Sequence, residues 1–349
     1  MIDAAVGPEG RVRVDRPPSL PRRVLLSAIL GLAVGVACHA HLQRAGILAG
    51  DFTWPWRAAQ ALLGGQNPYE VIRPVGPYPF DAFFKYPLPA AFVALPFAWL
   101  SAEAAGALFV GLSAALLAFA VTRQGHARLP IFLSGPFVSA VAVVQWSPLL
   151  AAAALLPWLG FVTAAKPNLG LPALAGRPTR AALLGAAALV GLSLLVAPWW
   201  PMAWLDVLRH GTETSYRAPV SLPGGALVLL VLLRWRRPEA RLVAVLACVP
   251  QIIAFYDQLL LLLVPRTLRQ SAVASLASLI AFQGWIWRGG HSPELWKGHT
   301  QGEPWVMALL YAPAVIMILH RPNEGDVPPW VDRVGRAALT WWRTPRTRR

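Results

Sequence analysis

Apolar residues occur along this chain in long runs, and short polar or basic stretches separate the runs. A helix needs about 20 apolar residues to cross a bilayer, and several runs approach that length. The runs do not alternate apolar and polar positions as barrel strands would. The sequence therefore predicts an all-α polytopic membrane protein with about ten transmembrane helices. The predicted spans are Val24–Gln43, Ala104–Val121, Leu129–Gln145, Ser147–Ala165, Ala181–Ala197, Val220–Leu233, Ala240–Tyr256, Gln258–Leu268, Gln270–Trp287 and Trp305–Leu319.

Two shorter segments differ from these spans. Pro87–Leu100 contains Pro87, Pro89 and Pro96, so it is short and broken for an ordinary span and is interpreted as a re-entrant or short segment. Trp54–Leu63 places apolar side chains along one face at helical spacing, which predicts a short helix lying on the membrane surface.

Composition agrees with a membrane protein, because 56% of the residues are hydrophobic and 13% are charged. The net charge of +15 would suggest a nucleic-acid partner in a soluble protein. Here most of the basic residues fall in loops and tails on one side of the alternating spans, as the positive-inside rule requires of cytoplasmic segments. We therefore expect an inner (cytoplasmic) membrane protein with both termini in the cytoplasm and no nucleic-acid partner.

One membrane domain is expected, at 24–319, between cytoplasmic basic tails at 1–23 and 320–349. Its first outer loop is 44–86. The two cysteines, Cys38 and Cys248, lie inside apolar segments and are interpreted as small hydrophobic residues.

Asp51 is the most informative polar residue, because it follows the outer end of the first predicted span. Aspartate is a good helix N-cap, so Asp51 can simply cap the helix that follows it. A carboxylate at the membrane boundary beside aromatic residues can equally serve as a general base whose pKa is tuned by partial burial. The sequence leaves both interpretations open.

The first outer loop resembles the signature of glycosyltransferase family 87. The matching residues are Asp51-Phe52, Ala58-Ala59-x-Ala61-Leu62-Leu63, Gly65-x-Asn67-Pro68-Tyr69 and Phe84-x-Tyr86-Pro87-x-Pro89. Weaker matches follow in order at Val144-Gln145-Trp146-Ser147, Ala164-Ala165-Lys166-Pro167 and Tyr256-Asp257-Gln258-Leu259. The last match has no histidine where the family has one, and the resemblance covers Leu25 to Arg269.

The resemblance implies a multi-spanning GT-C fold and transfer of a sugar, mannose above all, from a polyprenyl-phosphate donor to a lipid or glycan acceptor at the outer face. It makes Asp51 the catalytic base. The lipid-linked donor is a co-substrate, and no metal or other cofactor is expected. The donor phosphate needs cationic partners, and the outward-facing candidates are Arg57, Arg73, Lys85, Arg209 and Arg217. The aromatic residues expected to stack on the sugar or line the lipid entrance are Trp54, Trp56, Tyr69 and Tyr86.

Other polar residues have two interpretations each. Asp257 is either a second carboxylate of the site or a surface aspartate in a tight outer turn. Lys85 is either a phosphate contact or part of a turn where the chain re-enters the membrane. Lys166 is predicted to lie on the cytoplasmic side as a lipid anchor, and Gln145 to satisfy backbone groups at a break between spans.

Two other classes of function remain open. A transporter or lipid flippase would show paired halves and buried charges near the middle of the bilayer. A non-catalytic scaffold of the same fold is the third possibility, because the later motifs depart from the family pattern. The preferred prediction is a hexosyltransferase that uses a polyprenyl-phosphate sugar.

Overall fold

The computed structural model describes residues 18–80, 82–210, 216–288, 295–325, 327–329 and 332–333. Most of the two predicted tails lies outside these residues. The described chain is mostly helical. Its α-helices are α1 (Leu20–Ala45), α2 (Thr53–Leu63), α3 (Pro68–Val71), α4 (Pro89–Ala94), α5 (Ala102–Val121), α6 (Gly135–Ala142), α7 (Ser147–Ala153), α8 (Pro167–Gly176), α9 (Arg180–Val196), α10 (Trp200–His210), α11 (Pro238–Cys248), α12 (Leu268–Trp287), α13 (Leu295–Val306) and α14 (Ala312–Leu319).

Short 3₁₀ segments connect or replace several helices. They are η1 (Gly50–Phe52), η2 (Leu95–Phe97), η3 (Thr122–Gln124), η4 (Leu129–Leu133), η5 (Pro157–Ala164), η6 (Pro219–Ser221), η7 (Gly225–Arg234) and η8 (Phe255–Leu263), and a π-helical turn η9 (Met307–Tyr311) joins α13 to α14. Two two-residue strands, β1 (Ile72–Arg73) and β2 (Tyr78–Pro79), pair in the first outer loop.

Within the described residues, three helices are long and apolar enough to cross a membrane. They are Leu20–Ala45, Ala102–Gln124 and Gln301–Leu319, and the pair Arg180–Val196 and Trp200–Arg209, bent by 97°, makes a fourth if it is one span. A mostly helical, membrane-protein-like fold with several long apolar helices is therefore confirmed, whereas ten full spans are not shown. Many of the predicted spans are short α and 3₁₀ pieces, because Pro and Gly interrupt the apolar runs.

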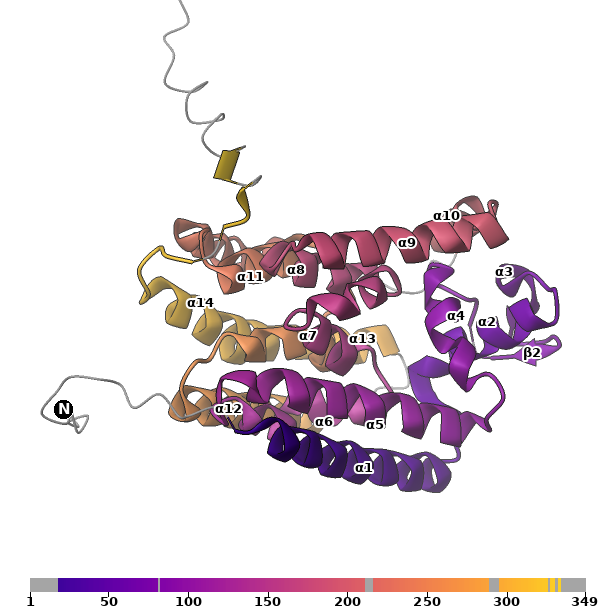
Figure 1. Ribbon diagram of the computed structural model, residues 1–349, viewed down its shortest axis with the longest axis horizontal. Helices are drawn as coiled ribbons and strands as arrows, with labels where there is room; N and C mark the ends of the chain where they lie inside the picture. The colour runs from indigo at the N-terminus through magenta and orange to yellow at the C-terminus, as the bar shows by residue number, and fades with distance from the viewer. Residues whose placement is uncertain are drawn as a thin grey trace, which may run out of the picture.

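The helices lie roughly along one direction (Figure 1), with α1 and α5 side by side at one edge and α9 continuing into α10 at the opposite edge. The helices α2, α3 and α4 gather at one end with β2. Helix α1 approaches α5 closely because both present glycine: a Cβ on Gly111 would lie 2.9 Å from the carbonyl oxygen of Gly31. Small residues allow this kind of backbone contact between membrane helices.

The segment predicted as one span, Ser147–Ala165, runs along the bundle and back again. Ala154 and Leu155, after α7, line a cavity together with Arg123, at the far end of α5. The chain then returns through η5. The hydrogen bond that Lys166 donates to Gln145, beside the start of α7, shows this return. Leu156 is extended and Pro157 follows it, so a continuous helix cannot pass this point. Lys166 consequently lies at the other end from the one predicted.

The first outer loop forms a small packed unit at one end of the bundle. Helix α2 confirms the predicted helix at Trp54–Leu63, and it packs against α4, the short helix of the predicted re-entrant segment. Buried residues of this unit contact the end of α9 and the start of α10 through Ala197 and Trp200. The loop is therefore a packed part of the fold.

Candidate functional site

The backbone around Asp51 is held against the segment that follows α6. Gly50 has a φ of 52°, which favours glycine, and a Cβ at this position would lie 2.5 Å from the carbonyl oxygen of Val143. The next peptide nitrogen, that of Asp51, donates a hydrogen bond of 2.9 Å to the same oxygen. Glycine at position 50 thus allows the close approach that places the Asp51 side chain.

The facing segment carries a second unusual backbone position. Val144 has a φ of 52°, which is a rare conformation for a β-branched residue and stores local strain. The next residue, Gln145, turns its side chain to Asp51 and donates a hydrogen bond from Nε2 to Oδ2 of the carboxylate. The strained turn therefore serves to aim the amide that contacts Asp51.

Gln145 connects Asp51 to a buried ion pair. Its Oε1 accepts a hydrogen bond of 2.9 Å from Nζ of Lys166, and the same Nζ lies 2.7 Å from Oδ1 of Asp257. Lys166 precedes α8, and Asp257 lies in η8. We call Asp51, Gln145, Lys166 and Asp257 the polar network. It unites four segments that are far apart in the sequence.

Asp51 is the most exposed member of the polar network. Gln145 and Asp257 are 1% and 2% exposed, and Lys166 is also buried, whereas Asp51 is partly exposed. It also lies outside the four candidate spans, in the loop after α1. The network thus presents one carboxylate and keeps its other charges inside the protein.

The surroundings of Asp51 raise its pKa to about 6. Burial is the largest cause, because it penalises the charged form, and the charge of Asp257 adds to it. The positive charge of Lys166 and the hydrogen bond from Gln145 oppose this rise. A carboxylate with this pKa is ionised at neutral pH and is basic enough to take a proton from a hydroxyl in a transition state.

Aromatic residues surround the network. The ring centres of Tyr86 and Trp146 lie 6.1 Å apart, and those of Trp54 and Tyr86 are separated by the same distance. Nζ of Lys166 lies 5.3 Å from the ring centre of Tyr256. Tyr86 therefore lies near Asp51 and Asp257, and Trp54 packs against Tyr86.

The other two predicted aromatic residues are packing residues. Trp56 is buried, and its indole nitrogen donates to the carbonyl of Phe97. Tyr69 is also buried, and its hydroxyl donates to the carbonyl oxygen of Tyr86, so that it supports the backbone of a site residue without facing the network itself.

The predicted phosphate-binding residues are spread over the same end of the molecule. The guanidinium of Arg57 lies over the ring of Trp56, and that of Arg217 forms an ion pair of 2.9 Å with Glu303. The backbone oxygen of Lys85 accepts from Trp204. The remaining two, Arg73 and Arg209, are exposed. Lys166, which the sequence predicts to be a lipid anchor, is instead a cation of the polar network itself.

Three sequence-based interpretations are wrong. Asp51 does not cap α2, whose preceding residue is Phe52, because its carboxylate contacts Gln145 instead. Asp257 is not a surface residue in an outer turn, because it is buried beside Lys166. Lys166 is not a lipid anchor, because it is buried and contacts Gln145 and Asp257. The sequence feature that could have identified Gln145 as a site residue is its position as a polar residue at a break between two apolar runs.

Within the described chain, no group of three or more His, Cys, Asp or Glu side chains is arranged to hold a metal ion. Comparison of the chain with protein-family models, with curated proteins and with solved structures found no match.

Proposed function

We propose that this protein is a membrane glycosyltransferase that moves a sugar, with mannose as the expected sugar, from a polyprenyl-phosphate donor to a lipid or glycan acceptor. The observation that carries the proposal is Asp51, a partly exposed carboxylate with a pKa of about 6 at the end of the first long apolar helix. The resemblance of the first outer loop to glycosyltransferase family 87 supports the same assignment.

Asp51 acts as the general base of the proposed reaction. Its carboxylate takes the proton of the acceptor hydroxyl, and the hydroxyl oxygen forms a bond to the anomeric carbon of the donor sugar. The bond between that carbon and the phosphate oxygen breaks on the opposite face, and the polyprenyl phosphate leaves with the electron pair. Such a displacement inverts the anomeric centre, as it does when a carboxylate activates water in inverting glycosidases.

The rest of the polar network positions the base. Gln145 holds the carboxylate through one hydrogen bond, and the pair formed by Lys166 and Asp257 fixes the amide of Gln145 from behind. Tyr86 and Trp54 form an aromatic wall against which a sugar ring can stack. The loop cations Arg57, Arg73, Lys85, Arg209 and Arg217 are the proposed partners of the donor phosphate.

One observation favours a transporter or flippase as the second candidate. Ionisable residues buried in a membrane protein commonly mark a substrate or proton pathway, and Lys166 and Asp257 form such a pair. In a transporter the carboxylates would bind and release protons without forming a glycosidic bond. The two functions therefore differ in whether the labelled sugar changes its covalent partner.

The test uses membranes that contain the wild-type protein, Asp51→Asn, or the matched control Asp206→Asn, an exposed aspartate of α10. Labelled mannose is supplied as polyprenyl-phosphate-mannose, and label in the lipid and glycan fractions is measured at equal protein levels. We expect Asp51→Asn to lower transfer by about 100-fold or more and Asp206→Asn to leave it unchanged. Equal transfer by wild type and Asp51→Asn would remove Asp51 from the chemistry. No transfer by wild type, with mannose or arabinose donors, would favour the transporter or the scaffold.

A further inference from the structure

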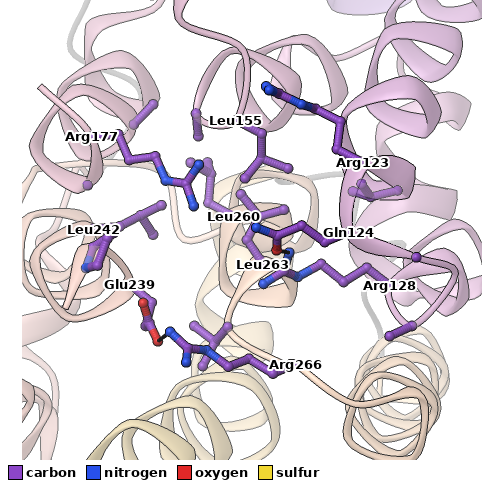
Figure 2. A pocket seen from close by; sticks show the side chains of 18 residues that line it. Arg123, Gln124, Arg128, Leu155, Arg177, Glu239, Leu242, Leu260, Leu263 and Arg266 are labelled. Atoms are coloured by element: carbon purple, nitrogen blue, oxygen red, sulfur yellow. Dashed lines mark hydrogen bonds and ion pairs between the residues drawn. The ribbon is translucent and has the colours of Figure 1, made fainter. Parts of the chain in front are cut away.

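A cavity of about 600 Å³ lies at the opposite end of the molecule from the first outer loop. It is lined where α5 and η3 end, where α8 ends and where α11 begins. Its apolar wall includes Leu155, Leu260 and Leu263 (Figure 2), the last two from the same 3₁₀ segment, η8, that carries Asp257. None of the four residues of the polar network lines the cavity, so the cavity is a separate site.

Positive charge dominates the lining. Arg123, Arg128, Arg177 and Arg266 line the cavity together with one acidic residue, Glu239. Figure 2 shows the side chains of Arg128 and Arg177 directed toward the middle of the cavity from opposite sides, whereas Arg266 turns to Glu239.

The one acidic residue of the lining, Glu239, already forms ion pairs. Glu239 lies 3.0 Å from Arg266 and 2.8 Å from Arg321, and Arg237 is 3.5 Å away. In the part of the chain that the structure describes, no carboxylate pairs with Arg123 or Arg177. Burial and the charges of Arg177 and Arg266 lower the pKa of Arg128. The cavity thus has an excess of positive charge, and a bound anion would reduce the repulsion between its arginines.

The form of the cavity indicates what kind of anion fits. Guanidinium groups bind phosphate with two parallel hydrogen bonds, which makes arginine clusters typical of phosphate sites. A small inorganic ion would leave the leucine side chains exposed to water, whereas a hydrocarbon chain would bury them. The position beyond the end of the apolar helix α5 is the depth at which lipid headgroups lie.

We propose that this cavity binds the phosphate headgroup of an anionic phospholipid, with Arg123, Arg128 and Arg177 contacting the phosphate and an acyl chain lying on Leu155, Leu260 and Leu263. The site is separate from the proposed site of sugar transfer, since no member of the polar network lines the cavity. Its occupant is a structural or regulatory lipid of the leaflet opposite to the polar network.

The test is a lipid titration of purified, delipidated protein, followed by native mass spectrometry. Phosphatidylglycerol is the anionic probe and phosphatidylcholine the neutral one. The test variant is Arg123→Gln/Arg177→Gln, which changes two exposed side chains, and the matched control is Arg180→Gln, an exposed arginine at the start of α9 that does not line the cavity. Equal thermal unfolding midpoints in phosphatidylcholine establish that the variants are folded.

The wild type and Arg180→Gln should bind one phosphatidylglycerol in preference to phosphatidylcholine, and the double variant should bind it at least about tenfold more weakly. Equal affinities of wild type and the double variant for phosphatidylglycerol would overturn the proposal, because binding would then reflect general surface charge. If inorganic phosphate or glycerol 3-phosphate bound as tightly as phosphatidylglycerol, the lipid assignment would be wrong.

Discussion

Asp51 depends on three neighbours for its protonation behaviour, and each acts in a known direction. Burial and the charge of Asp257 favour the neutral carboxyl, whereas Lys166 and the amide of Gln145 favour the carboxylate. The balance leaves a pKa of about 6. A base is active only when deprotonated, so the proposed chemistry should titrate with this group.

The rate of transfer should therefore be nearly constant above pH 7 and fall about tenfold per pH unit well below pH 6. Gln145→Leu removes a hydrogen bond to the ionised form, so it should move the midpoint of the profile to higher pH. The measurement is kcat/KM against pH for both proteins. A midpoint that stays in place in Gln145→Leu would mean that another group titrates.

The pair formed by Lys166 and Asp257 should show strong coupling in stability. Lys166→Met leaves a buried carboxylate without its partner, and Asp257→Asn leaves a buried ammonium, so each should cost about 3–5 kcal/mol. The double variant removes both charges and should be more stable than the sum of the two losses predicts. Thermal unfolding of the four proteins in one detergent measures this. Additive losses would show that the two groups do not interact.

At this scale the sequence identifies residues better than it identifies their roles. Asp51 and Asp257 stood out because carboxylates beside apolar runs are uncommon. Lys166 and Gln145 were assigned to other tasks, because their contacts with the two carboxylates join positions 91 and 94 residues apart. Periodicity and local motifs do not reveal contacts of that separation.

At the scale of elements, long continuous helices are predictable, whereas chain reversals inside apolar runs are not. The predicted spans that became α1, α5, α9 and α12 lie within a few residues of the observed helices. The reversal at Pro157 was missed because α7 and η5 are both apolar, so hydropathy reads two short segments as one long span. The misplacement of Lys166 follows from this single error.

Two glycines near the end of α1 allow a test of how the loop holds Asp51. Both have positive φ, but a Cβ on Gly46 meets nothing within 4 Å, whereas one on Gly50 meets the Val143 carbonyl. Gly46→Ala should cost about 1–2 kcal/mol from backbone strain alone. Gly50→Ala should cost more and should also lower the rate of transfer, because it must displace Asp51. Unfolding and transfer assays on both variants check this, and equal effects would remove the special role of position 50.

At the scale of the whole molecule, an arginine cluster lies at one end and the polar network lies toward the other. Arg23 at the start of α1 faces Arg123, and Arg321 after α14 binds Glu239 beside the arginine-lined cavity. The first and last long apolar helices thus begin and end at the same basic end. From the positive-inside rule we propose that this end faces the cytoplasm.

Sidedness can be tested with single cysteines at two exposed arginines, Arg44 after the apolar part of α1 and Arg180 at the start of α9. The background is Cys38→Ala/Cys248→Ala. In intact cells a membrane-impermeant maleimide should label Arg44→Cys, and Arg180→Cys should react only after the membrane is opened. Labelling of both positions from outside would contradict the proposed orientation.

The ion pair of Lys166 with Asp257 also has a consequence for the order in which the protein assembles during synthesis. The ribosome makes Lys166 well before Asp257, so the nascent chain carries a lone ammonium toward the lipid without its counter-ion. A lone charge is expensive in hydrocarbon, and a lysine relieves this cost by keeping its amine near the headgroups. We therefore expect α7 and η5 to take their final positions only after η8 has been synthesised. Truncated chains that end before η8 would insert their helices but leave the polar network unassembled.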